Sequence, residues 1–168
     1  MRTRLQSSLG FVGESQLVGA VVRELAATSS PWSPSSVIEE FDYGSGKTDV
    51  LALSALGHVI AFEAKLRDWR RALHQAWRNT SFANQAYVVL PARLSEVAEK
   101  HAWAFRELGV GLCVAEATKL SVLLESKTTE PLIVWLHKKA REALEANGRR
   151  PSNGTCATSL PGTRVRLC

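Results

Sequence analysis

Cysteine is scarce in this sequence, with three in 168 residues, and none shows the paired spacing of a metal site or a disulfide framework. Long apolar runs are also missing, since no window approaches the roughly 18 uninterrupted apolar residues that a membrane span requires. Residues 1–8 carry charges with no apolar segment after them, so we expect no secretory signal. These absences argue against a disulfide-stapled or membrane-spanning protein and lead us to expect a cytoplasmic one.

Acidic residues are missing from residues 147–168, which carry four arginines and are rich in Gly, Pro, Ser and Thr. We therefore expect this segment to be a disordered basic tail. The tail accounts for most of the net charge of +5, since residues 1–146 carry 17 basic and 16 acidic side chains. With 45% hydrophobic and 22% charged residues, the composition is typical of a globular protein, and residues 1–146 are expected to form a single domain.

Apolar periodicity divides residues 1–146 into helices and strands. The expected elements, in order, are helix 14–27, strands 37–41, 49–53 and 59–65, helix 67–79, strand 86–91, helix 95–108, strand 110–114 and helix 131–146. Asp68 and Ser95 are expected N-caps, and Trp77 is expected on the sheet-facing stripe of its helix. Consecutive strands predict an antiparallel meander, and strands separated by helices predict parallel pairs. The expected fold class is α/β, or α+β if the meander dominates, with a mixed central sheet flanked by helices in the order α-βββ-α-β-α-β-α.

Three polar residues interrupt the apolar pattern of the second and third expected strands. Asp49 begins the second strand, whereas Glu63 and Lys65 stand two residues apart near the end of the third. Side chains two residues apart on a strand share a face, so the acid and the base are expected on the same side, after Val59 and Ala61. The residues of the opposite face are all apolar. The third strand therefore presents charged groups at one end of one face.

A divalent cation would explain this arrangement, because burying an unpaired charge is costly. Mg²⁺ prefers a few carboxylate oxygens and keeps several waters. Asp49 and Glu63 can supply such oxygens, and the backbone carbonyl of Ala64 another. Lys65 can hold or help deprotonate a water and stabilise charge on a phosphate. Two simpler interpretations stay open: an ion pair of Glu63 with Lys65 on a solvent-facing edge, and an Asp49 that bonds backbone amides of the preceding turn.

The spacing of Asp49, thirteen residues and then Glu63-Ala64-Lys65 resembles the D…ExK signature of the PD-(D/E)xK nuclease superfamily. That group includes many restriction endonucleases and archaeal-type Holliday-junction resolvases. Its restriction endonuclease-like core is a helix, a three-stranded meander, a helix and a strand, with the acid on the second strand and ExK on the third. The same order is expected here over residues 10–115. Thr48 stands where the name of the motif has proline.

The resemblance also implies roles for residues outside the motif. An acidic residue in the first helix of the superfamily corresponds to Glu14, expected to face inward, and a polar residue after ExK, often Gln in relatives, corresponds to Gln75. By resemblance, Asp49 and Glu63 bind Mg²⁺, with Mn²⁺ as an alternative ion, and Lys65 positions the attacking water. The resemblance also implies that Glu14 and Gln75 are accessory catalytic residues. The alternatives are a Glu14 favoured by the helix dipole and a solvated Gln75. The implied reaction is phosphodiester hydrolysis that leaves a 5′-phosphate.

Basic residues cluster at and after the end of the third expected strand. Residues 65–78 hold five lysines or arginines against one acidic residue. The side chains expected to contact nucleic acid, here and in the preceding turn, are Lys47, Arg67, Arg70, Arg71, His74 and Arg78. Because they adjoin the expected site, they can neutralise phosphates there. The alternative is an ordinary solvated helix face.

The sequence thus predicts a metal-dependent deoxyribonuclease acting on double-stranded or branched DNA, without membrane association. Cutting both strands requires two sites, which favours a homodimer. Two other functions stay open. One is a catalytically inactive nuclease-fold module that binds DNA or regulates a larger assembly, and the other is a protein-interaction domain that binds no nucleic acid.

Overall fold

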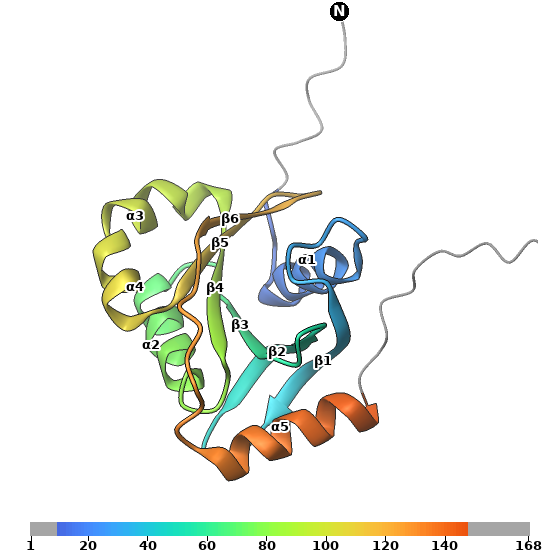
Figure 1. Ribbon diagram of the computed structural model, residues 1–168. Coiled ribbons are helices and arrows are strands. Elements are labelled where there is room, and N and C mark those ends of the chain that lie inside the picture. Colours follow the sequence, from blue (N-terminus) through green and yellow to red (C-terminus); the bar gives the residue numbers. More distant parts are fainter. Residues whose placement is uncertain (1–9, 148–168) are drawn as a thin grey trace, which may run out of the picture.

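A six-stranded sheet forms the centre of the protein in a computed structural model that describes residues 10–147. Its strands lie in chain order across the sheet (Figure 1). They are β1 (Pro34–Asp42), β2 (Lys47–Ser54), β3 (Val59–Ala64), β4 (Gln85–Pro91), β5 (Gly111–Ala115) and β6 (Leu120–Leu124). The first three form the expected antiparallel meander, β3, β4 and β5 are parallel, and β6 is antiparallel to β5. The sheet is therefore mixed, and the predicted α+β class is confirmed.

Helices cover both faces of this sheet (Figure 1). They are α1 (Glu14–Ala26), α2 (Trp69–Asn79), α3 (Ser95–Lys100), α4 (Ala102–Leu108) and α5 (Val134–Asn147), with a 3₁₀ turn (Ala92–Leu94) before α3. Leu17 and Val21 of α1 pack on one face with Phe62 of β3. The other face packs against α2, α4 and α5, for example through Phe105 and Ala140. Because β3 is buried on both faces, a polar side chain on it needs a partner or a function.

Capping residues fix two of the helix ends. Asp68 is the N-cap of α2 as predicted, because its Oδ1 accepts a hydrogen bond of 3.0 Å from the Arg71 amide. Gly109 follows α4 with φ of +68°, a left-handed conformation that favours glycine. The prediction for Ser95 is wrong, since it is the first residue of α3 and its side chain makes no capping bond; Leu94 precedes the helix instead.

The chain contains one strand more than expected, and one expected helix is divided in two. The strand β6 pairs with β5 at the edge of the sheet. The helix expected over 95–108 is broken at His101, whose ring stacks on Trp69 with 4.8 Å between centroids. The last helix begins at Val134, later than expected. The order of elements is therefore α-βββ-α-β-α-α-β-β-α, which corrects the predicted order after β4.

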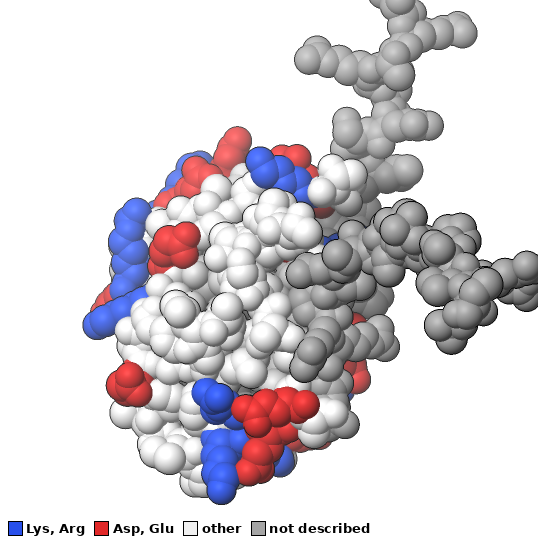
Figure 2. All heavy atoms as spheres, turned by 45° about the vertical axis from the view of Figure 1, so that its right-hand side comes forward, with Lys and Arg blue, Asp and Glu red and all other residues white. Residues whose placement is uncertain are grey.

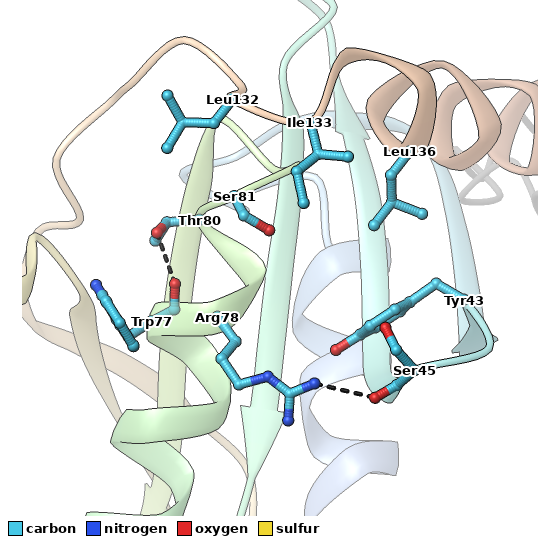
Figure 3. Close-up of a pocket in the computed structure, with 9 residues that line it drawn as sticks. All are labelled: Tyr43, Ser45, Trp77, Arg78, Thr80, Ser81, Leu132, Ile133 and Leu136. Carbon is cyan, nitrogen blue, oxygen red and sulfur yellow. Dashed lines mark hydrogen bonds between the residues drawn. The ribbon is translucent and has the colours of Figure 1, made fainter.

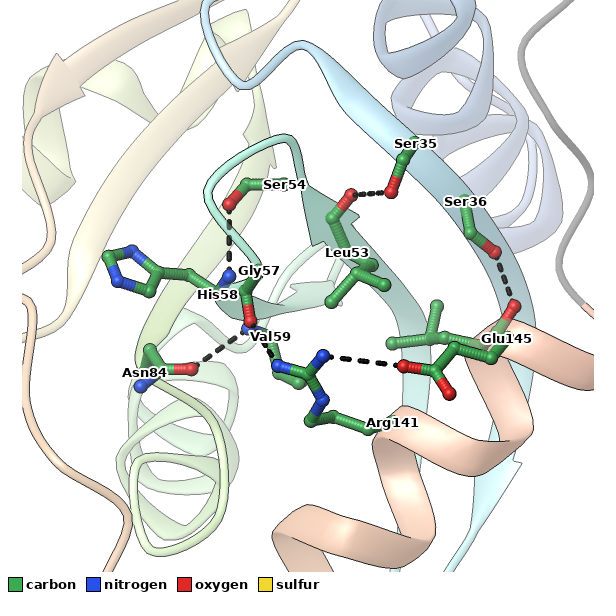
Figure 4. A network of polar contacts seen from close by, with 11 residues as sticks. Ser35, Ser36, Leu53, Ser54, Gly57, His58, Val59, Asn84, Arg141 and Glu145 are labelled. Atoms are coloured by element: carbon green, nitrogen blue, oxygen red, sulfur yellow. Dashed lines mark hydrogen bonds and ion pairs between the residues drawn. The ribbon is translucent and has the colours of Figure 1, made fainter.

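Polar contacts fasten α5 across the meander (Figure 4). Arg141 donates a hydrogen bond of 2.8 Å to the carbonyl of Gly57, in the turn between β2 and β3. Gly57 has φ of +81°, which requires a residue without a Cβ or a strained one. Ser36 of β1 donates a hydrogen bond of 2.6 Å to the carbonyl of Leu144. These bonds tie the second half of α5 to the sheet, so the helix is part of the fold rather than an appendage.

Charges of both signs mix on the face shown in Figure 2, and much of its middle carries no charged side chain. Residues 10–147 hold 15 lysines and arginines against 16 acidic residues, so this part of the chain is close to neutral. Within the same range, no helix is long and apolar enough to cross a membrane. The expected tail 147–168 lies outside the described residues, apart from Asn147 at the end of α5.

Candidate functional site

Three of the expected site residues, Asp49, Glu63 and Lys65, lie at one end of the sheet, where β2 begins and β3 ends. These strands are antiparallel, and the pairing of Val50 with Phe62 places Asp49 beside Glu63. Glu63 lies on the face that packs against α2, in the same row as Val59 and Ala61, as the strand periodicity predicts. The structure therefore brings together the two carboxylates that the sequence separates by thirteen residues.

Glu63 is the most unusual charged residue of the site. Its side chain is only 1% exposed. Its Oε1 accepts a hydrogen bond of 2.7 Å from the Asn79 amide, whereas its Oε2 is buried and has no partner among the described residues. Burial, and then the carboxylate of Asp49, raise the pKa of Glu63 to about 8, while the Asn79 amide and Lys65 act in the opposite direction. An ionised Glu63 is thus unfavourable unless further positive charge reaches it.

Asp49 joins the two strands through its side chain. Its Oδ2 accepts a hydrogen bond of 2.8 Å from the backbone amide of Ala64, across the β2–β3 pair. The turn before β2 uses another carboxylate, because the Gly44 amide donates a hydrogen bond of 2.7 Å to Asp42. The amide that Asp49 holds is therefore on the neighbouring strand and not in the turn. This bond orients the carboxylate next to Glu63.

Lys65 follows the end of β3 and faces the first helix. Its ammonium forms an ion pair of 2.8 Å with Glu14, the first residue of α1. The Lys65 side chain is only 16% exposed, whereas that of Glu14 is 49% exposed. The expectation that Glu14 faces inward is therefore wrong, because it lies at the rim of the site. Lys65 is paired with Glu14 rather than with Glu63, so it does not neutralise the Asp49–Glu63 pair by direct contact.

Asn79 is the site residue that the sequence interpretation missed. It ends α2, is fully buried, and donates the hydrogen bond that holds Glu63. Its Oδ1 accepts a long hydrogen bond of 3.4 Å from the hydroxyl of Tyr43, just after β1. A signal for it exists in the sequence, because Trp69, Ala72 and Asn79 fall on one side of a helix. A polar residue at such a stripe position predicts a buried side chain, but not the residue that it contacts.

Gln75 lies one turn before Asn79, on the same side of α2. Its side chain is partly buried, and its Oε1 has no hydrogen-bond partner among the described residues. Two acceptor oxygens from neighbouring elements are therefore left without donors, one on Glu63 and one on Gln75. The resemblance assigned Gln75 an accessory role, and the structure places it on the helix that contacts Glu63.

The six residues expected to contact nucleic acid differ in their surroundings. Lys47 forms an ion pair of 3.0 Å with Glu40. The guanidinium of Arg70 lies 4.5 Å from the ring centroid of Trp69, and Arg78 donates a hydrogen bond of 3.0 Å to the carbonyl of Ser45. The other three, on or just before α2, are exposed: Arg67, Arg71 and His74. Basic side chains thus lie along α2, and the last residue of that helix, Asn79, contacts Glu63.

The chemistry of the donor set fits a hard divalent cation. Asp49 and Glu63 are adjacent carboxylates, and one carboxylate oxygen is buried without a donor. No group of three or more His, Cys, Asp and Glu side chains is placed to hold a metal within residues 10–147. A metal here would therefore need ligands beyond the two carboxylates, and Mg²⁺ commonly completes its shell with backbone carbonyls and water. The carbonyl of Ala64, between Glu63 and Lys65 in the sequence, is the backbone ligand that the sequence predicts.

Comparison with known proteins shows a shared fold and no established activity. No known protein family and no curated protein matches the sequence. Among solved structures, the chain is similar to SPO1766, a protein of unknown function from Silicibacter pomeroyi, with a TM-score of 0.57, 16% identity, and coverage of 80% of this chain and 82% of the other. SfsA of Pyrococcus furiosus, solved in complex with Ca²⁺, is a more distant match, with a TM-score of 0.38 and 13% identity over 69% of this chain and 65% of that one.

Proposed function

We propose that this protein is a metal-dependent deoxyribonuclease of the PD-(D/E)xK type, which hydrolyses phosphodiester bonds in DNA. The observation that carries the proposal is the buried, unpartnered Oε2 of Glu63 next to the carboxylate of Asp49. Two adjacent carboxylates repel each other in a buried setting, and a divalent cation between them removes that penalty. The D…ExK spacing, on the expected strands, supports the same conclusion.

Each residue of the site has a distinct task in this proposal. Asp49, Glu63 and the carbonyl of Ala64 would hold Mg²⁺ or Mn²⁺, which when bound supplies a Lewis acid for the phosphate and its attacking water. Asn79 positions Glu63 through their 2.7 Å hydrogen bond. Lys65 donates hydrogen bonds to the water or to a phosphate oxygen, and the ion pair with Glu14 directs its ammonium.

Substrate affinity would come from the basic side chains along α2. Residues 10–147 are nearly neutral in total, so within this part of the chain a local cluster must provide the phosphate contacts. Arg67, Arg70 and Arg71 are exposed around the start of α2, close in sequence to Lys65. This placement supports a phosphate backbone that passes over the N-terminal part of α2.

Cleavage of DNA tests the proposed activity. The full chain is incubated with linear, supercoiled and branched DNA, with and without Mg²⁺ or Mn²⁺. We expect metal-dependent cleavage that falls at least about 100-fold in Asp49→Ala and Lys65→Ala. Lys138→Ala serves as the matched control, because Lys138 is also ion-paired but lies on α5. Lys65→Ala protein that cuts as well as the Lys138→Ala protein would overturn the assignment.

The Lys65–Glu14 ion pair favours a second candidate, a nuclease-fold module that binds DNA without cutting it. A lysine engaged by a carboxylate is less available to a water or a phosphate, and its nearest charged partner is Glu14. The same assay separates the two candidates. Salt-sensitive DNA binding without cleavage in any metal would support the binding module, and the absence of both would leave a protein-interaction domain.

A further inference from the structure

A pocket of about 320 Å³ opens beside the candidate site (Figure 3). It lies where the end of α2 meets the β1–β2 turn and the start of α5. Tyr43 and Trp77 line it on two sides with Arg78 between them, and Ile133 and Leu136 close it from above in the view of Figure 3. Pockets of this size, mostly apolar and with a few polar groups, are typical of small-molecule and nucleoside sites.

The walls of the pocket combine aromatic rings with one cation. Trp77 is 44% exposed although it is large and apolar, and Leu132, which also lines the pocket, is strongly exposed. The prediction that Trp77 packs on the sheet is therefore wrong; the residue lines the pocket, and its half-exposed ring lies at a tilt against His74, with 5.6 Å between centroids. Arg78 donates one hydrogen bond to the carbonyl of Ser45, and its side chain is exposed.

Tyr43 connects this pocket to the Glu63 carboxylate. Its ring packs on Phe82, with centroids 5.3 Å apart, and its hydroxyl donates to Asn79, which in turn donates to Glu63. The β1–β2 turn leaves room for the Tyr43 ring only because residue 46 is glycine; a Cβ on Gly46 would overlap the ring. The pocket is therefore separated from the candidate metal ligands by one buried side chain, that of Asn79.

We propose that the pocket binds an unpaired nucleobase of the DNA, next to the phosphate that the site cleaves; this inference rests on the proposed function. An aromatic ring that is half exposed offers a stacking surface, and stacking of bases on such rings is a common mode of single-strand recognition. Arg78 adds positive charge at the same place, which suits a phosphate on the deoxyribose of the same nucleotide. An aliphatic ligand would use the apolar wall but not the cation.

DNA with one unpaired nucleotide tests the pocket. Binding of the full chain is measured by fluorescence anisotropy in EDTA, where no metal-dependent cleavage competes. The two probes are a duplex with one bulged nucleotide and the same duplex with an abasic residue at the bulge. We expect the wild type to prefer the base by about fivefold or more, and Trp77→Ala to bind both probes equally.

Two further variants make the result specific. Trp103→Ala is the matched control, because Trp103 is 62% exposed but lies on α4 and does not line the pocket. It should keep the preference, and Trp77→Phe should restore most of it because a ring is retained. No preference in the wild type, or equal losses in Trp77→Ala and Trp103→Ala, would overturn the inference.

The outcome is separable from that of the proposed function. Metal-dependent cleavage without a base preference would refute the nucleobase pocket and support the proposed nuclease activity. The opposite result is a base preference that is lost in Trp77→Ala, with no cleavage in Mg²⁺ or Mn²⁺. It would refute the nuclease activity and support the nucleobase pocket. If neither probe binds at low salt, the proposal that the pocket binds a nucleobase is refuted, whatever the cleavage assay shows.

Discussion

At the scale of single residues, Glu63 lies in an environment that disfavours the ionised form of its carboxyl. Its carboxyl is buried, faces a second carboxylate on β2, and receives one hydrogen bond from Asn79 on α2. Lys65, the cation next to it in sequence, is paired with Glu14. The protonated form of Glu63 therefore suits the metal-free protein, whereas the ionised form suits a protein with a cation bound.

The raised pKa of Glu63 predicts how the stability of the metal-free protein depends on pH. Between the ordinary value of 4.5 and about 8, folded Glu63 keeps its proton while unfolded Glu63 has lost it. The folded state then binds more protons, so the free energy of unfolding falls as the pH rises through this range. Glu63→Gln removes that contribution, which is on the order of a few kcal/mol.

Denaturant unfolding of the wild type and Glu63→Gln, in EDTA at pH 5, 7 and 9, measures the effect. The free energy of unfolding of the variant should exceed that of the wild type by an amount that grows with pH. Other groups titrate in both proteins, so the difference between the two isolates Glu63. A difference that stays constant with pH would contradict the raised pKa.

Strand periodicity and motif spacing predict the two carboxylates of the candidate site, but not the Asn79 side chain that holds Glu63. Asp49 and Glu63 were predicted because a carboxylate in an apolar strand breaks the pattern, and the meander then makes them neighbours. Asn79 was missed because its hydrogen bond to Glu63 depends on the angle at which α2 crosses the sheet. That angle follows from packing of α2 against β3 and β4, which no local pattern encodes.

At the scale of elements, the start of α2 depends on one capping bond. Asp68→Ala should lower the free energy of unfolding by about 1 kcal/mol, because the Arg71 amide loses its acceptor. Ser95→Ala is the matched control at the start of α3, and it should cost little because the Ser95 side chain makes no capping bond. Urea unfolding of both variants is the measurement, and similar losses in the two would contradict the assignment of caps.

The elements that the sequence mispredicted are those decided by contacts between distant segments. The strand β6 is a five-residue, partly exposed edge strand, and an apolar run of that length does not distinguish a strand from other structure. The helix over 95–108 breaks at His101, where the ring stacks on Trp69 of α2. In contrast, α1, the meander, α2, β4 and β5 have strong local patterns and lie within three residues of their predicted bounds, with the largest difference at the start of β1.

At the scale of the whole molecule, residues 10–147 are nearly neutral, so any DNA affinity of this part of the chain must come from a local cluster. Arg71→Glu, on the exposed side of α2, should weaken DNA binding and reduce the dependence of log affinity on log salt by about one or more. Arg23→Glu is the matched control, because Arg23 is exposed near the end of α1, the helix on the other face of the sheet. Salt titrations of DNA affinity should separate them, and equal effects would show that the α2 cluster has no special role.

The central claim is that Asp49 and Glu63 together hold a divalent cation, and a calorimetric titration of Mn²⁺ or Mg²⁺ into the full chain tests it most directly. The wild type should bind one ion per chain, saturably. Both Asp49→Ala and Glu63→Gln should lose this binding, and circular dichroism should show that both variants remain folded. Saturable binding that survives in Glu63→Gln, or no binding in the wild type, would contradict the account.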